Sequence, residues 1–301
     1  MKGVVRGAPL QRLLKDLFNS FIKTYLTHLL GLLFLRGINA RETLKVFHAG
    51  LIFLFSYTYL SGRRDNGHFF LYLRKRYGIR YLCWRTFGYK VILRTNCLAD
   101  YLVLRPDYEY LIREYFKPKP NDIVVDVGAY IGTYTLMAAR RVKQKGLVIA
   151  VEPDPENFRL LLLNLSLNGI RNVMPIRVAV ADVDGDITFF VSKERTGSSV
   201  TRIPEDLENK IMVHAVKLDT IVGKLALPRI DWLKIDVEGA EALVLKGASK
   251  TLEITRRLII EVWPENKREI YKILKQHGFK IIKIIRVTTG FMDTINVIAE
   301  R

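Results

Sequence analysis

The apolar positions of the first sixty residues recur at helical spacing. Between residues 10 and 35 they alternate with polar positions in a pattern that predicts an amphipathic helix. A second helix is predicted over 41–60, and its stretch 46–60 is almost wholly apolar. These 15 residues are fewer than the roughly 20 that cross a bilayer. A hairpin at a membrane surface, a packed helical cap and a true span all stay open, in this order of preference.

The segment that follows has shorter elements. Strands are predicted over 81–87 and 90–93, on either side of Gly88, and a helix is predicted over 107–116. Pro118-Lys119-Pro120 then marks a boundary. We therefore expect three regions: a basic helical extension at 1–65, a connecting segment at 66–120 and a main domain at 121–301.

From residue 121 onward, buried strands and amphipathic helices alternate. Strands are predicted over 123–127, 147–151, 173–181, 232–237 and 258–262, and helices over 131–143, 155–168, 240–252 and 266–277. A hairpin-like insert occupies 184–218, and 279–287 with 294–299 predict a final antiparallel hairpin. Repeated strand–helix units predict an α/β fold with a doubly wound, mostly parallel sheet.

A glycine turn between two of these strands forms the predicted ligand site. Strand 123–127 is followed by Gly128 and Gly132, which let the backbone turn tightly and approach a ligand. The next buried strand ends at Glu152, where a carboxylate can accept hydrogen bonds from two ribose hydroxyls. Asp126 stands just before the turn, where it would repel a pyrophosphate but attract a cationic amine. The unit therefore favours S-adenosylmethionine over NAD as its ligand.

A second group of charged residues ends another predicted strand. Lys234, Asp236 and Glu238 alternate with apolar residues, so the three charges share one face. Such a row is costly in a covered sheet unless it lies at the carboxyl end, where open α/β sheets bind their ligands. We expect Asp236 and Glu238 on the rim of a cleft, and Lys234 deeper, paired with a carboxylate. A salt-bridge cluster without a ligand is the alternative.

The positive charge is concentrated in the first 120 residues. They carry 21 Lys and Arg against 7 Asp and Glu, whereas the remainder carries 27 against 23. This skew favours an anionic partner such as membrane headgroups, an acidic lipid-linked substrate or nucleic acid; a generally basic surface is the alternative. Cys83 and Cys97 are the only cysteines and lack metal-binding spacing, so we expect a reducing, cytoplasmic setting.

These motifs resemble the FkbM family of methyltransferases. The matching segments follow the family's order: 125–132 (VDVGAYIG), 151–153 (VEP), 181–185 (ADVDG), 198–200 (SSV), 217–220 (KLDT), 234–241 (KIDVEGAE) and 261–262 (EV). The segment 234–241 is the most specific of them. Tyr130 departs from the family's usual Asn, and residues 1–65 lie outside the resemblance.

The resemblance implies a Rossmann-like class I methyltransferase sheet of seven strands, ending in an antiparallel hairpin, with S-adenosylmethionine as cofactor. It also implies the site residues. The cofactor residues would be Asp126, Gly128, Ala129, Gly132, Glu152, Ala181 and Asp182. Asp236 and Glu238 would approach the methyl group, one of them as general base, and Glu241 and Glu261 would lie at the acceptor.

Two other groups of residues could take part in this chemistry. His214 is a rival general base, but its place in an alternating strand favours a structural role. A magnesium site of the catechol-methyltransferase type would need several carboxylates, as Asp236, Glu238, Glu241 and Glu261 could offer. We nevertheless expect no metal.

The predicted function is O-methylation of a sugar, glycan or lipid-linked saccharide, with residues 1–65 holding the enzyme at the cytoplasmic face of an anionic membrane. An RNA methyltransferase is an alternative. Base methylation usually follows a strand ending in Asp/Asn-Pro-Pro-aromatic, whereas residues 236–239 read DVEG and would repel phosphates. A non-catalytic membrane-associated binding protein is the third possibility, and the acids at 126 and 152 argue against it.

Overall fold

The computed structural model describes residues 44, 74–76, 79–104, 108–193, 195, 197–289 and 292–301. The helices predicted over 10–35 and 41–60 lie outside these residues, apart from Leu44. Within the described ranges, no helix is long and apolar enough to cross a bilayer. The chain divides into two compact units, residues 1–85 and 86–301.

The described elements begin with two short strands. β1 (Tyr81–Thr86) lies almost wholly in the first unit, and the second unit opens with β2 (Tyr89–Arg94), α4 (Leu98–Leu102) and α5 (Tyr110–Tyr115). The strands predicted on either side of Gly88 are therefore confirmed, as is the helix before the Pro-Lys-Pro boundary.

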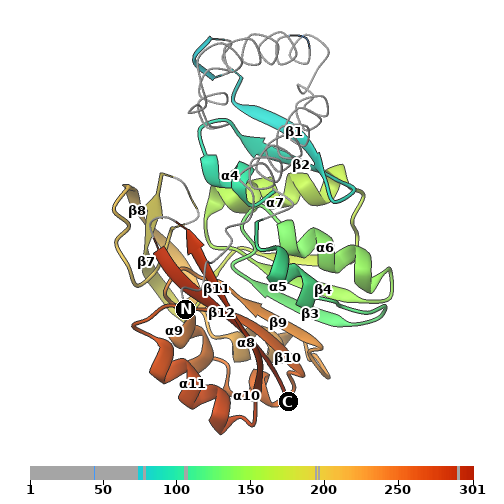
Figure 1. The fold of residues 1–301 in the computed structure, drawn as a ribbon, viewed down its shortest axis with the longest axis vertical. Coiled ribbons are helices and arrows are strands. Elements are labelled where there is room, and N and C mark those ends of the chain that lie inside the picture. Colours follow the sequence, from blue (N-terminus) through green and yellow to red (C-terminus); the bar gives the residue numbers. More distant parts are fainter. Residues whose placement is uncertain are drawn as a thin grey trace, which may run out of the picture. The chain divides into compact units, whose positions relative to one another are not determined.

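A seven-stranded sheet forms the centre of the second unit (Figure 1). In spatial order its strands are β11 (Lys280–Thr289), β12 (Met292–Glu300), β10 (Arg257–Val262), β9 (Trp232–Ile235), β3 (Ile123–Val127), β4 (Leu147–Val151) and β5 (Val173–Ile176). Only β12 runs antiparallel to its neighbours β10 and β11; the other pairs in this sheet are parallel. The predicted class I sheet with a terminal antiparallel hairpin is confirmed.

Successive residues of the central strands pack into two separate cores. Val124 and Val148 face α5 and α6 (Thr133–Val142), whereas Val125 and Ile149 face the opposite layer. That layer contains α8 (Leu218–Lys224), α9 (Glu241–Lys246), α10 (Ser249–Glu253) and α11 (Lys267–Gln276) (Figure 1). Because helices cover both faces, a ligand must enter at the carboxyl ends of the strands.

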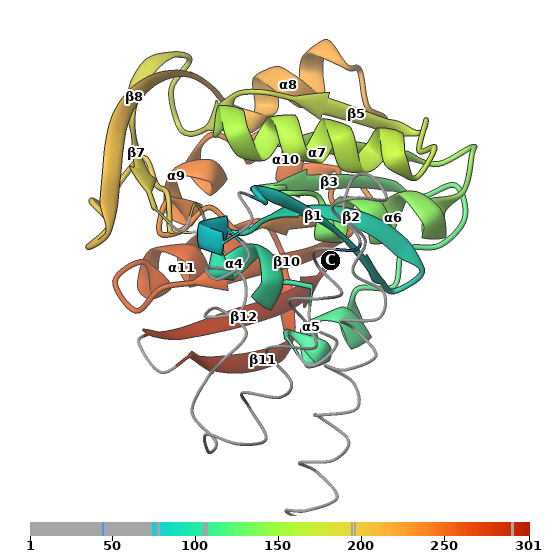
Figure 2. The same cartoon turned by 90° about the horizontal axis from the view of Figure 1, so that it is seen from above.

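The strand predicted over 173–181 is in fact two elements. β5 ends at Ile176, and β6 (Ala179–Val180) pairs with β8 (Leu207–Val216). β8 also pairs antiparallel with β7 (Gly185–Ser192), so the predicted insert becomes a three-stranded sheet beside the main one (Figure 1, Figure 2). The chain leaves the main sheet here because β8 satisfies the backbone of β6, a pairing with a distant segment that local sequence does not reveal.

A buried ion pair joins the end of β2 to α4 and contacts the glycine turn through Tyr130. Arg94 and Asp100 are 1% and 0% exposed, and two hydrogen bonds of 2.8 and 2.7 Å join the guanidinium to the carboxylate. The hydroxyl of Tyr130 donates to the same carboxylate at 2.5 Å. Tyr130, the departure from the family pattern, therefore fastens α4 against the turn.

Replacing Asp100 should destabilise the protein far more than replacing an exposed acid. Asp100→Ala leaves the buried Arg94 charge without its carboxylate, so we expect a loss of about 3–5 kcal/mol in the free energy of unfolding. Tyr130→Phe should cost about 1–2 kcal/mol. Urea unfolding of the full chain measures both. Glu269→Ala, which breaks an exposed pair with Lys246, should cost less than about 1 kcal/mol; equal losses for Glu269→Ala and Asp100→Ala would contradict the assignment.

Candidate functional site

A cavity of about 880 Å³ opens at the carboxyl ends of the central strands. Its wall includes seven residues predicted for the site: Asp126, Gly128, Ala129, Glu152, Asp236, Glu238 and Glu261. Gly132, Ala181, Asp182 and Glu241 do not line it. The cavity is within the size range of small-molecule sites and brings together residues that are up to 135 positions apart in the sequence.

The glycine turn brings β3 into direct contact with the end of β9. Gly128 has φ of +82°, and a Cβ there would lie 1.8 Å from the carbonyl oxygen of Asp236. Gly132 also has positive φ and begins α6, so its part is to shape the turn rather than to line the cavity. The tight turn predicted for these glycines is present, and at Gly128 the close approach is to protein backbone. Their approach to a ligand stays a prediction.

Asp126 is the buried acid before this turn. The Thr135 hydroxyl donates to its Oδ2 at 2.6 Å, whereas Oδ1 has no hydrogen-bond partner within the described part of the chain. Burial raises the pKa of Asp126, and Lys234 opposes that rise. This buried oxygen on the cavity wall is therefore open to a hydrogen-bond donor that enters the cavity.

Glu152 sits at the tip of β4, beside Asp126 on the next strand. It accepts hydrogen bonds from the backbone N–H groups of Tyr130 at 2.8 Å and Asp154 at 3.0 Å. Burial, followed by the charge of Asp154, raises the pKa of Glu152 to about 7. The backbone donors fix the direction of the carboxylate, so both acids predicted for the donor site face one cavity from adjacent strands.

Asn157 and Ser192 are cavity residues that the sequence did not single out. Asn157 lies in the first turn of α7 (Pro155–Leu167), and its Nδ2 donates to Glu152 at 3.3 Å. Its Oδ1 and the Oγ of Ser192 are buried and have no partner among the described residues. The sequence does contain a signal for Asn157, because it lies in the first turn of the helix predicted to start at Pro155, directly after the strand that ends at Glu152. No sequence signal marks Ser192, which ends a strand of the insert.

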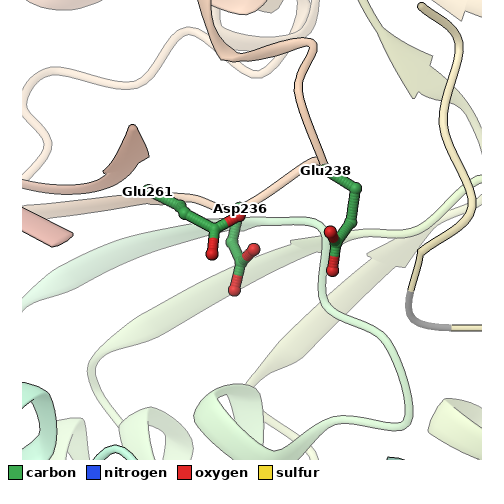
Figure 3. A group of neighbouring side chains, drawn as sticks. All are labelled: Asp236, Glu238 and Glu261. Atoms are coloured by element: carbon green, nitrogen blue, oxygen red, sulfur yellow. The ribbon is translucent and has the colours of Figure 1, made fainter. Parts of the chain in front are cut away.

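Three carboxylates line the other half of the cavity. Asp236 and Glu238 follow β9, Glu261 belongs to β10, and one oxygen of each lies within 4.8 Å of the others. Figure 3 shows the three side chains pointing in the same direction from the strand ends. Burial, then Glu261, raises the pKa of Glu238 well above its ordinary value. A cation could bridge these oxygens, but hydroxyl donors could as well, so the expectation of no metal stays a prediction.

Lys234 lies between the two halves. It is 5% exposed, stands opposite Asp126 in the β3–β9 register, and its Nζ is 2.9 Å from Asp236 Oδ2. β9 ends at Ile235, so Asp236 begins a loop instead of continuing the predicted strand. The predicted pairing of a deeper Lys234 with a carboxylate is confirmed.

The remaining predicted residues lie around the cavity. Glu241 is fully buried, and its Oε1 accepts from the N–H groups of Val237 and Gly239 at 3.1 and 3.0 Å, so it holds the loop that carries Asp236 and Glu238. Ala181 and Asp182 follow β6, whereas Val178, Ala179 and Val180 line the wall. His214 is exposed and pairs with Asp186 on the β7–β8 hairpin, which agrees with the expected structural role.

Comparison with known proteins connects this geometry to an established domain. Residues 126–281, just over half of the chain, match the family model described as the methyltransferase FkbM domain. The match includes the glycine turn, Glu152 and the segment 234–241.

Three curated relatives differ in how much they share with the chain. Methyltransferase sdnD of Sordaria araneosa is 27% identical over 64% of this chain and 90% of its own length. Hexuronic acid methyltransferase AglP of Haloferax volcanii is 27% identical over 52% of this chain and 62% of its own length. The tRNA(Phe) (4-demethylwyosine(37)-C(7)) aminocarboxypropyltransferase of Methanocaldococcus jannaschii is 39% identical over 42% of this chain and 51% of its own length.

The matched region covers the cavity-lining residues from Asp126 to Trp263. It contains Asp126 on β3, Glu152 at the end of β4, Asp236 and Glu238 after β9, and Glu261 on β10. The chain belongs to the FkbM family of S-adenosylmethionine-dependent methyltransferases.

Proposed function

We propose that this methyltransferase acts on an oxygen of a sugar, a glycan or a lipid-linked saccharide. The observation that carries the proposal is the cluster of Asp236, Glu238 and Glu261, whose oxygens lie within 4.8 Å of one another on the cavity wall. Carboxylates accept hydrogen bonds from hydroxyl groups. The relative AglP supports this, because a hexuronic acid presents only oxygen atoms as methylation sites.

The donor half of the cavity suits S-adenosylmethionine. The unpartnered Oδ1 of Asp126 would accept from the cationic amine of the methionine end. Glu152 would accept from the ribose hydroxyls, while Asn157 and Ser192 offer two more buried oxygens to the nucleoside. The fit is good because these buried oxygens without a partner would face hydrogen-bond donors of the cofactor.

The residues at the acceptor side would have two different roles in methyl transfer: one would accept the proton and two would orient the hydroxyl. When bound, S-adenosylmethionine supplies an electrophilic methyl group; transfer forms a C–O bond, breaks a C–S bond and releases the hydroxyl proton. Glu238 is the base that we favour, because it lies in the carboxylate cluster and its raised pKa makes the ionised form a stronger proton acceptor. Asp236, held by Lys234, and Glu261, held by the Trp263 indole N–H at 3.0 Å, would orient the hydroxyl.

Cofactor affinity should rise with pH through the titration of Glu152. Its pKa of about 7 lies above the ordinary value, so the group is mostly protonated below that pH. Ribose hydroxyls donate to the ionised form, so S-adenosylmethionine should bind about tenfold more tightly at pH 8 than at pH 6. Calorimetry on the full chain measures this. Glu152→Gln should remove this dependence of the Kd on pH. The pKa of Glu241 is also raised to about 7, and Glu241→Gln should leave the dependence unchanged. A dependence that survives Glu152→Gln would refute the assignment.

Glu238→Gln should reduce turnover without weakening cofactor binding. Losing a general base should lower kcat about 10²–10⁴-fold. Methyl transfer would be followed by mass spectrometry on a panel of neutral sugars, uronic acids and lipid-linked saccharides. The exposed Glu265→Gln is the control and should leave kcat unchanged. Retention of more than half of kcat in Glu238→Gln would remove Glu238 from the role of base.

A second candidate function comes from the relative in Methanocaldococcus jannaschii, whose name specifies transfer of an aminocarboxypropyl group to tRNA. The basic first 120 residues would suit RNA phosphates. The clustered carboxylates at the acceptor side disfavour a polyanion near the reacting atoms. The same mass measurement, with tRNA added to the panel, separates the two functions, because an aminocarboxypropyl group adds a different mass from a methyl group.

Residues 1–65 remain the proposed contact with an anionic membrane surface. We expect the full chain to float with vesicles containing anionic lipid, and salt to weaken the association. The chain starting at residue 66 should stay at the bottom of the gradient, as should the full chain with purely zwitterionic vesicles. Equal flotation of both chains would show that residues 1–65 are not the contact.

A further inference from the structure

Lys234 is a buried cation whose position goes beyond the pairing with Asp236. Its Cα is the register partner of Asp126 in the parallel β3–β9 ladder, and it lines the cavity. Its Nζ lies 2.9 Å from Asp236 Oδ2 and 4.7 Å from the centre of the Tyr134 ring. Lys234 therefore stands between the acid of the donor half and the first acid of the acceptor half.

The charge on this lysine is firmly held. Burial lowers the pKa of Lys234, but Asp236, Asp126 and Glu109 together raise it above its ordinary value. Glu109, which also lines the cavity, accepts a hydrogen bond from the Tyr134 hydroxyl at 2.8 Å. Asp236 contacts the ammonium group directly, and the charges of Asp126 and Glu109 also favour its protonated form, so the cavity wall carries this positive charge at neutral pH.

The other cations on the cavity wall are engaged elsewhere. Among the described residues these are Arg195 and Arg202. Arg195 pairs with Asp154 at 3.0 Å and with Glu208, and Arg202 lies over the Trp263 ring at 4.1 Å. Among the described residues, Lys234 is therefore the cation of the cavity wall that can act directly on the charge of a donor bound beside Asp126.

The donor and the product of methyl transfer differ by one charge. S-adenosylmethionine carries a sulfonium, and S-adenosylhomocysteine carries a neutral thioether with the same amine, carboxylate and nucleoside. A fixed cation penalises the first relative to the second. Because transfer discharges the sulfonium, the penalty is relieved as the reaction proceeds, which is a difference between ground state and transition state of the kind that accelerates a reaction.

We propose that Lys234 sets the ratio of affinities for S-adenosylmethionine and S-adenosylhomocysteine, by offsetting the carboxylates that would otherwise hold the sulfonium too tightly. This inference rests on the donor placement proposed above, with the amine at Asp126, and is independent of the identity of the acceptor. Lys234 is thus a specificity-determining residue for the methyl donor as well as a partner of Asp236.

The test is calorimetry with both ligands on the full chain at low salt. The ratio of the Kd for S-adenosylhomocysteine to the Kd for S-adenosylmethionine should rise at least about tenfold in Lys234→Met, the effect of one charge at short range in a protein. Lys234→Arg keeps the charge and should stay within twofold of wild type. Lys246→Met, at an exposed ion pair on α9, is the surface control and should also stay within twofold.

A second background keeps the test decisive if Lys234→Met does not fold. Asp236→Asn should lower the ratio, because the lysine charge is then less compensated. Adding Lys234→Met to Asp236→Asn removes the buried pair as a unit, which proteins tolerate better than loss of one partner, and should raise the ratio about tenfold again.

A merely structural role would weaken both ligands together and leave the ratio unchanged. A ratio within twofold of wild type in a folded Lys234→Met protein, or an unchanged ratio between the two Asp236→Asn backgrounds, would overturn the inference. So would failure of both ligands to bind the wild-type chain. Because no acceptor enters these measurements, a failure of the proposed sugar methylation would be seen only in the acceptor panel, and the two failures are distinguishable.

Discussion

The pairing of β3 with β9 is the contact on which the rest of the site depends. It brings Gly128 so close to the Asp236 carbonyl that only a glycine fits, and it sets Asp126 beside Lys234. A slip of one residue would turn these side chains to opposite faces of the sheet. One backbone register therefore fixes how Asp126 and the acids that follow β9 lie relative to each other on the cavity wall.

The same register concentrates charge that the protein would not otherwise bury. The raised pKa values of Glu152, Glu238 and Glu241 record what it costs to hold carboxylates away from water. Backbone N–H donors and one lysine offset part of that cost. On the proposed function, the cationic donor and a hydroxyl-bearing acceptor would offset more of it.

Local pattern was enough to predict the parts of the site that end parallel strands. Asp126, Glu152 and Asp236 each follow a buried apolar run. The alternation of strands and helices predicts parallel strands, whose carboxyl ends meet at one edge of the sheet, so these three acids were expected to converge on one cavity. The break inside 173–181 was missed because pairing with β8 overrides local propensity. Ser192 was missed for the same reason, since its place depends on how the insert folds back.

The β7–β8 hairpin has a consequence for how acceptor specificity can change. Its first strand ends in Ser192, next to the donor half, and the segment after it carries Arg195, tied to Asp154 at the start of α7. The same segment carries Arg202, stacked on Trp263 at the acceptor half. The hairpin therefore contacts two separate parts of the cavity wall and is not an independent module. On the proposed placement of donor and acceptor, exchanging the hairpin between family members would alter the surroundings of the methyl donor as well as those of the acceptor.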